Sequence, residues 1–127
     1  MNAAIGEICV ITSPYFDIKT NQNSFKLRPA LVISELRNND YCVLPISRVT
    51  RRENLDAYFD VPIDKSNYPA LNLNNDSFIR THKQTTVHKA AITQIIANLK
   101  TEYPELFLTI LLKFDEHHND MINSALK

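Results

Sequence analysis

Up to His88 the sequence consists of short β-branched or aromatic runs separated by polar residues. Such runs are typical of β-strands. Their spacing favours an antiparallel, barrel-like sheet over alternating βαβ units. The six candidate strands are Ile8 to Thr12, Ala30 to Ser34, Tyr41 to Ile46, Tyr58 to Ile63, Ser77 to Thr81 and Thr85 to His88.

The connections between these runs are made almost without glycine, because Gly6 is the only glycine of the chain. Phosphate-binding loops of the G-x-G-x-x-G or G-x-x-x-x-G-K-[ST] kind are therefore excluded. Asn38-Asn39-Asp40 and Asn72 to Asp76 are predicted to be turns, since Asn and Asp tolerate left-handed backbone. Lys83-Gln84 predicts a tight hairpin between the last two runs. The segments 13–27 and 49–57 are expected to be long loops.

The end of the chain has the i, i+3, i+4, i+7 periodicity of a helix. Thr101 is a candidate cap, and Pro104 and Glu105 suit a first turn. Ala90 to Leu99 fits either a short helix or a final strand around Ile92 to Ile96. The expectation is one β-rich α+β domain over residues 1–127, with a C-terminal helix. Its apolar stripe consists of Phe107, Ile110, Leu111, Phe114, His118 and Met121.

Compartment and redox chemistry are constrained by a few features. The most apolar stretch, Leu106 to Leu112, is too short to span a bilayer, and Met1 to Gly6 lacks the features of a signal peptide. A cytoplasmic protein without a membrane segment is therefore expected. Cys9 and Cys42 belong to no C-x-x-C pair and lie in apolar runs, so both are interpreted as buried strand residues.

Charge is balanced overall but segregated along the chain. The formal net charge is zero, with 14 Lys and Arg against 14 Asp and Glu. Between Asp17 and Arg52, however, seven basic residues face three acidic ones, and the balance from Asp76 to Lys100 is also positive. A neutral chain with this distribution can present a basic face to an anionic ligand.

Four segments in order resemble the PemK/MazF family of toxin endoribonucleases. They cover most of the chain, and their order makes the resemblance fairly specific. The segments are Gly6-Glu7-Ile8-Cys9-Val10, Arg28-Pro29-Ala30-Leu31-Val32-Ile33-Ser34, Leu44-Pro45-Ile46-Ser47, and Asp76-Ser77-Phe78-Ile79-Arg80 leading to Thr86-Val87-His88-Lys89.

This resemblance implies a small SH3-like antiparallel barrel of the CcdB/MazF kind and a homodimer. It implies cleavage of single-stranded RNA, such as mRNA, at short sequences without a metal or other cofactor. It also implies inhibition by a cognate antitoxin protein. The family's Arg before Pro and its Thr or Ser after the third strand correspond to Arg28 and Ser47, the two candidate catalytic residues.

The chemistry of these two residues fits metal-free RNA cleavage. A forked, permanently charged Arg28 can hold two phosphate oxygens of a developing phosphorane. For Arg28 the competing interpretation is a surface ion pair. Ser47 can orient a phosphate oxygen, although a hydroxyl bonded to its own backbone is an equal alternative. The loop Asn21 to Leu27 lacks the Asp or Glu that some family members carry as a base, so the general base is left open.

Further residues are candidates for RNA binding. Basic side chains suit phosphates, and aromatic rings suit unstacked bases. His82 can exchange protons near neutral pH, but a solvated hairpin tip is the plainer interpretation of it. His88 is expected to be structural, and His117-His118 to be a solvated helix face rather than a metal site. The candidates are Lys26, Arg48, Arg80, His82 and Lys83, with Phe25 or Tyr15 for base stacking.

Two other functions remain open. The missing loop carboxylate allows a non-catalytic RNA-binding barrel, and the fold allows a gyrase-poisoning toxin like CcdB, although that activity needs no phosphate-holding Arg28. Leu106, Leu108 and Leu112 lie off the helix stripe and either face a second subunit or pack under the sheet. An acidic antitoxin segment is expected to cover the basic face in competition with RNA.

Overall fold

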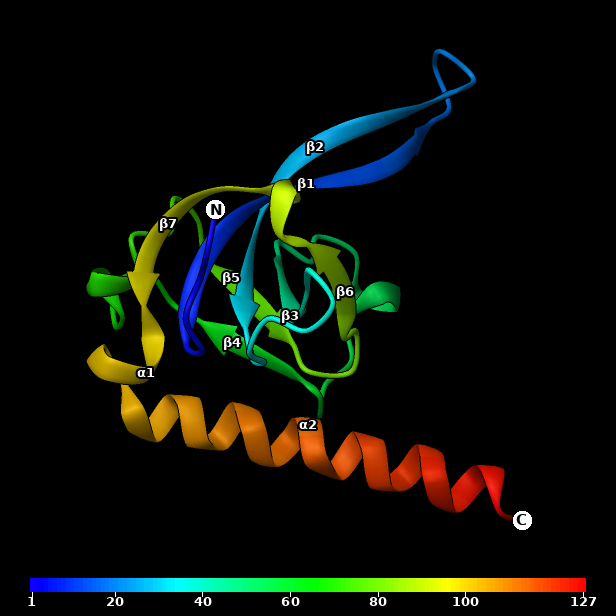
Figure 1. Cartoon of the computed structure of the whole chain (residues 1–127). Helices are drawn as coiled ribbons and strands as arrows, with labels where there is room; N and C mark the ends of the chain where they lie inside the picture. The colour runs from blue at the N-terminus through cyan, green and yellow to red at the C-terminus, as the bar shows by residue number, and fades with distance from the viewer.

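The computed structural model describes residues 1–127 as one antiparallel sheet with a long C-terminal helix lying beneath it (Figure 1). Three 3₁₀ turns, η1 to η3, connect the strands. The strands are β1 Glu7–Asp17, β2 Gln22–Val32, β3 Asp40–Ser47, β4 Asp60–Ile63, β5 Ser77–Arg80, β6 Thr85–His88 and β7 Ile92–Asn98. The other elements are η1 Arg52–Asn54, η2 Pro69–Leu71, η3 Lys89–Ala91, α1 Leu99–Glu102 and α2 Pro104–Ala125.

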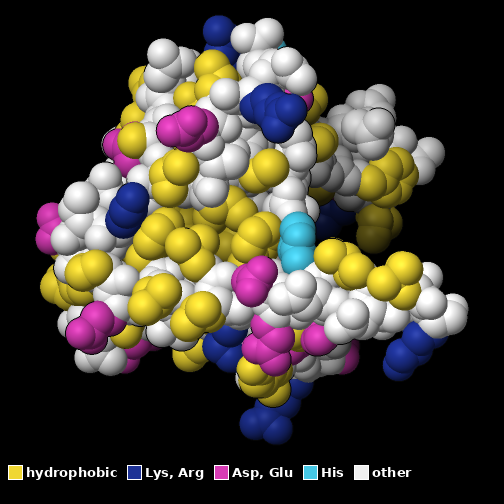
Figure 2. Space-filling view, turned by 60° about the horizontal axis from the view of Figure 1, so that its bottom comes forward, with side chains coloured by type: hydrophobic (Ala, Val, Ile, Leu, Met, Phe, Trp, Pro, Cys, Tyr) yellow, Lys and Arg dark blue, Asp and Glu magenta, His cyan; other side chains and the backbone are white.

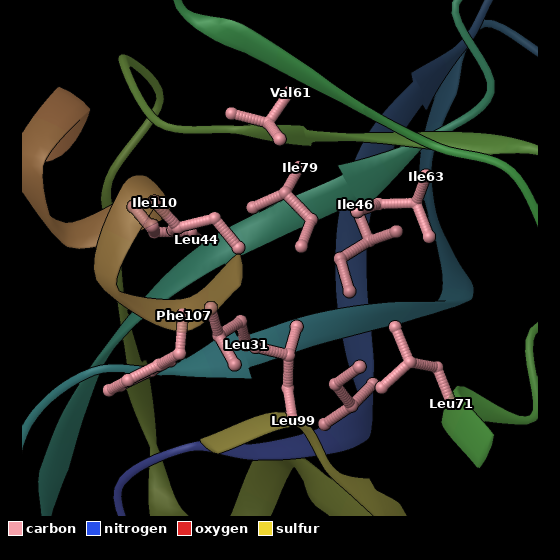
Figure 3. Packing of buried hydrophobic residues seen from close by; sticks show 11 residues of the cluster. Leu31, Leu44, Ile46, Val61, Ile63, Leu71, Ile79, Leu99, Phe107 and Ile110 are labelled. Atoms are coloured by element: carbon pink, nitrogen blue, oxygen red, sulfur yellow. The ribbon is translucent and has the colours of Figure 1, made fainter. Parts of the chain in front are cut away.

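The predicted β-rich α+β class is confirmed, although the sheet does not close. Its strand order is β4-β5-β3-β2-β1-β7, with β6 also paired to β3. The end strands β4 and β7 each pair on one side only and do not pair with each other. Leu99, Phe107 and Ile110 of the helices complete the main core that the sheet leaves open (Figure 3). The helices therefore take the place of a closing strand pair.

Strands β1 and β2 are much longer than predicted. The segment expected to be a loop over residues 13–27 forms a β-hairpin instead, whose pairing runs from Ile8↔Leu31 to Asp17↔Gln22. Backbone hydrogen bonds hold its outer part, where few side chains are buried, and Asn21 makes the turn with φ 55°. The hairpin extends beyond the rest of the sheet (Figure 1). Because the outer part of this hairpin packs on no core, its side chains need no apolar pattern, and the sequence therefore did not predict these strands.

The predicted hairpin at Lys83-Gln84 is wrong. Strands β5 and β6 do not pair with each other; both pair with β3, at opposite ends of it. Between them, buried Thr81 donates its backbone N–H and its hydroxyl to the Phe59 carbonyl, at 3.2 and 2.7 Å. These bonds hold the chain against the start of β4, so it bulges instead of reversing. The turn at Asn38-Asn39 is confirmed, with φ values of 53° and 68°.

The second half of the chain settles the ambiguous segment. Ala90 to Leu99 is mainly strand β7, antiparallel to β1. Asn98 caps the short helix α1, because its side-chain oxygen accepts the Thr101 N–H at 3.1 Å. The prediction that Thr101 caps the long helix is wrong, since α2 has Tyr103 at its N-cap and no side-chain cap. Helix α2 then begins at Pro104, which needs no backbone donor there. Gly6 has φ 95°, and a Cβ at Gly6 would collide with the Lys100 side chain, so glycine is required there.

Both cysteines are free thiols within strands. Cys9 is fully buried, and burial together with Glu7 raises the pKa of its thiol to about 11. Cys42 is only half-buried. None of the helices is long and apolar enough to cross a membrane.

The docking of α2 gives the first testable prediction. Ile110 is fully buried in the main core, so Ile110→Ala should lower the free energy of unfolding by about 2–5 kcal/mol. The matched control on the same helix is Ile122→Ala, at a side chain that is 55% exposed. Its effect should stay below about 0.5 kcal/mol. Urea denaturation of the two variants measures the difference, and equal losses would contradict this packing of α2.

Candidate active site

Arg28 and Ser47 lie across from each other at the end of the β2–β3 pairing. The paired residues are Ala30↔Pro45, Leu31↔Leu44 and Val32↔Val43. Continuing this register by two residues places Arg28 opposite Ser47, and alternation along a strand puts them on one face of the sheet. Beyond this point β2 remains paired only to β1, as part of the extended hairpin.

Two hollows meet at this pair of residues. Both are lined by Arg28 and Ser47, and no Asp or Glu lines either of them. The first, of about 510 Å³, also takes in Lys26, Arg48 and the turn over residues 72–75. The second, of about 550 Å³, also takes in Arg80, His82 and Lys83. The structure thus brings together five of the six predicted RNA-binding residues with both predicted catalytic residues.

Arg28 and Ser47 are free to bind a ligand. Half-buried Arg28 makes no ion pair, since every ion pair of the structure involves Asp60. The Ser47 hydroxyl makes no hydrogen bond within the protein, so the alternative in which it bonds its own backbone does not apply. The ammonium of Lys26 lies 4.3 Å from the ring centroid of Tyr15, which holds that cation at the base of the hairpin.

Arg80 is held differently, by a buried carboxylate behind the second hollow. Its Nε donates to Asp60 Oδ1 at 3.0 Å and its Nη2 to Asp60 Oδ2 at 3.3 Å. The Asp60 side chain is fully buried and also accepts the Asp56 backbone N–H at 2.8 Å. Much of the Arg80 charge is therefore neutralised within the protein, whereas the charge of Arg28 is not.

His82 lies beside Asp60 and Arg80 and forms a cluster with them. Its Nδ1 lies 3.7 Å from Asp60 Oδ1, is buried and has no hydrogen-bond partner. Burial lowers the pKa of His82, while Asp60 and Asp56 act in the opposite direction. The interpretation of His82 as a solvated hairpin tip is wrong, because no hairpin forms here and only 12% of its side chain is exposed.

The helix histidines also differ from expectation. His117 is half-buried, with its ring centroid 5.0 Å from Phe59 and 6.1 Å from His82. His118 Nε2 lies 2.9 Å from the Gln84 side-chain oxygen. The prediction of a solvated face is therefore wrong for both, because α2 crosses beside the β5–β6 bulge. His88 is structural as predicted, since its Nδ1 accepts the Ala90 N–H at 3.0 Å.

Phe25 is not brought into the site. It is 67% exposed on the hairpin and lines neither hollow. Conversely, two parts of the site were not expected from the sequence. The turn over residues 72–75 was recognised as a turn but not as a wall of the hollow, and Asp60 was hidden within a predicted strand. An acid inside the apolar run from Tyr58 to Ile63 was the available signal.

The lowered pKa of His82 predicts a pH dependence of stability. Between that lowered value and the ordinary 6.5, the unfolded chain binds more protons at this residue than the folded chain does. His82 therefore makes stability fall as pH drops through this window. His82→Gln should flatten the decline in melting temperature between pH 7 and pH 5 relative to wild type. Parallel melting curves across this range would show that His82 does not contribute.

Comparisons with known proteins agree with this architecture. The chain is similar to the Mycobacterium tuberculosis toxin MazF-mt6, with a TM-score of 0.51 and 21% sequence identity, covering 84% of this chain and 96% of that chain. At this identity the likeness concerns the fold. No curated protein matches the sequence. A family model described as the PemK-like, MazF-like toxin of type II toxin-antitoxin systems matches residues 6–113. The chain therefore belongs to this family of toxins, which are paired with antitoxins.

Proposed function

We propose that this toxin is a sequence-specific endoribonuclease that cleaves single-stranded RNA without a metal ion. The observation that carries the proposal is the position of Arg28, which faces Ser47 where two cationic hollows meet and makes no ion pair of its own. A guanidinium without a carboxylate partner is available to a phosphate.

The geometry suits transesterification at phosphorus. Charge accumulates on the nonbridging oxygens when the 2′-hydroxyl attacks, and fixed cationic donors there lower the barrier. Arg28 can donate to two of these oxygens at once. Ser47, on the same face, is placed to donate its hydroxyl hydrogen to a phosphate oxygen and so to fix the phosphate against Arg28.

The surrounding cations give the RNA a path through the site. Lys26 and Arg48 line the first hollow, and Lys83 lines the second, on either side of the Arg28–Ser47 pair. A single strand crossing both hollows would place successive phosphates near these side chains. A strand that continued along the hairpin would reach exposed Phe25, whose ring could then stack on a base.

A non-catalytic RNA-binding protein is the second candidate. It is favoured by one observation: no carboxylate lines either hollow, so the base that some relatives use is missing. Gyrase poisoning is less well supported, because contact with a protein would not require an unpaired arginine at the junction of two cationic hollows.

Two partners belong to the same proposal. The antitoxin would place an acidic segment over the cationic hollows and exclude RNA by competition. A second copy of the chain would cover apolar surface of α2, where Leu108 and Leu112 are 58% and 59% exposed. Hydrophobic side chains also gather in the angle between α2 and the sheet (Figure 2).

The first test is cleavage of a long single-stranded RNA in EDTA, with the product ends mapped. Wild type should cut at a repeated short sequence, and Arg28→Ala should cut about 10²–10³-fold more slowly because the phosphorane loses its cationic donor. The matched control is Arg37→Ala, at an exposed arginine outside both hollows. RNA binding without any cleavage by wild type would overturn the nuclease and leave the binding protein.

The path of the RNA is tested by the salt dependence of binding to a 2′-O-methyl RNA, which cannot be cleaved through its 2′-oxygen. Each of Lys26→Ala and Lys83→Ala should reduce the slope of log affinity against log salt by about 0.7, because one phosphate contact is lost. Lys100→Ala, at an exposed lysine outside the hollows, should leave the slope unchanged. Equal slopes in all variants would contradict this path.

A further inference from the structure

We propose that His82 is the general base of this toxin, the group that takes the proton from the attacking 2′-hydroxyl, and that Asp60 and His117 position its ring. The inference rests on the proposed function and supplies the base that the hairpin loop lacks.

The lining of the second hollow singles out His82. This hollow contains Arg28 and Ser47, so a phosphate held there lies in the same space as the histidine. Of its ten lining residues, His82 alone has a side chain whose ordinary pKa lies near neutrality. The others are cationic, hydroxyl, amide or proline side chains: Ser13, Pro14, Arg28, Pro45, Ser47, Arg80, Lys83, Gln84 and Thr85.

The buried carboxylate behind the ring suits a base. His82 Nδ1 faces Asp60 Oδ1 at 3.7 Å, which leaves Nε2 as the nitrogen available to a substrate. When Nε2 takes a proton, the ring becomes a cation, and the adjacent carboxylate stabilises that charge. Asp60 is itself fixed by Arg80 and by the Asp56 N–H, so the carboxylate stays behind the ring.

The charges around His82 set its protonation state. Asp60 and Asp56 favour the protonated ring, whereas burial, Arg80 and Lys83 favour the neutral ring, and burial is the largest effect. The ring of His117, on α2, also faces the ring of His82. The balance lowers the pKa of His82, so at neutral pH the ring is unprotonated and able to accept a proton.

Helix α2 holds this arrangement from the other side. His117 packs against His82 and Phe59, with ring centroids 6.1 and 5.0 Å apart. The helix is anchored there because the Tyr58 hydroxyl donates to Glu116 at 2.6 Å and Lys113 Nζ donates to the Tyr58 carbonyl at 2.8 Å. The family match ends at residue 113, so His117 lies in a part of α2 that the family pattern does not describe.

The resulting step balances. The 2′-hydroxyl proton moves to His82 Nε2 as the 2′-oxygen forms a bond to phosphorus. The bond from phosphorus to the 5′-oxygen breaks, and that oxygen takes a proton from water. The products are a 2′,3′-cyclic phosphate end and a 5′-hydroxyl end, and His82 returns its proton to solvent.

The test is the pH profile of RNA cleavage in EDTA by wild type, His82→Gln and His88→Gln. Wild-type kcat should rise with pH through the pKa of His82 and then level off. His82→Gln should lose this rise and about 10²–10⁴-fold of kcat, with little change in KM, because a base acts on the proton rather than on binding. His88→Gln, at an exposed histidine outside both hollows, should retain the wild-type profile.

Two further variants separate a base from a packing residue. Added imidazole should restore part of the activity of His82→Ala, and His117→Ala should displace the pH profile while retaining more activity than His82→Gln. If wild type cleaves and Arg28→Ala does not, but His82→Gln keeps the wild-type kcat and profile, the role of His82 is wrong and the nuclease stands. If wild type does not cleave RNA at all, both proposals fail.

Discussion

Strand β3 is hydrogen-bonded to three other strands, and both the core and the candidate site depend on that pairing. β2 occupies one edge of it, while β6 and β5 follow one another along the opposite edge. Its buried residues alternate between two clusters, with Leu44 and Ile46 in one and Tyr41 and Val43 in the other. Because the strand is fixed on both edges and both faces, Ser47 at its end has a fixed position relative to Arg28.

Electrostatics then divides the basic residues into two groups. Buried Asp60 binds Arg80 through both carboxylate oxygens, so the main role of this arginine is to neutralise the buried carboxylate. Arg28 has no such partner and faces space large enough for a nucleotide phosphate. The same carboxylate lies 3.7 Å from His82 Nδ1, so one buried acid neutralises an arginine and adjoins a histidine. A chain with no net charge thereby presents a cationic site, since its acids lie behind that site or elsewhere.

The sequence predicted the strands well where they contribute side chains to the core. The apolar run Tyr41 to Ile46, and the helical stripe with Phe107 and Ile110, identified elements that pack on the core. It failed for the outer half of the β1–β2 hairpin, which is held by backbone bonds, and for the β5–β6 bulge, which depends on a hydrogen bond from Thr81 to a distant carbonyl. Neither feature leaves a local pattern of side chains.

The site shows the same division. Arg28 and Ser47 were predicted from short segments that resemble a known family, and the structure places them on one face of the sheet among basic side chains. The partners of His82 were not predicted, since Asp60 lies 22 residues before it and His117 lies 35 residues after it in the sequence. Residue types and strand periodicity are local properties that a sequence carries directly. Which acid stands behind which base depends on strand register and helix docking, and these are fixed only when the whole chain packs.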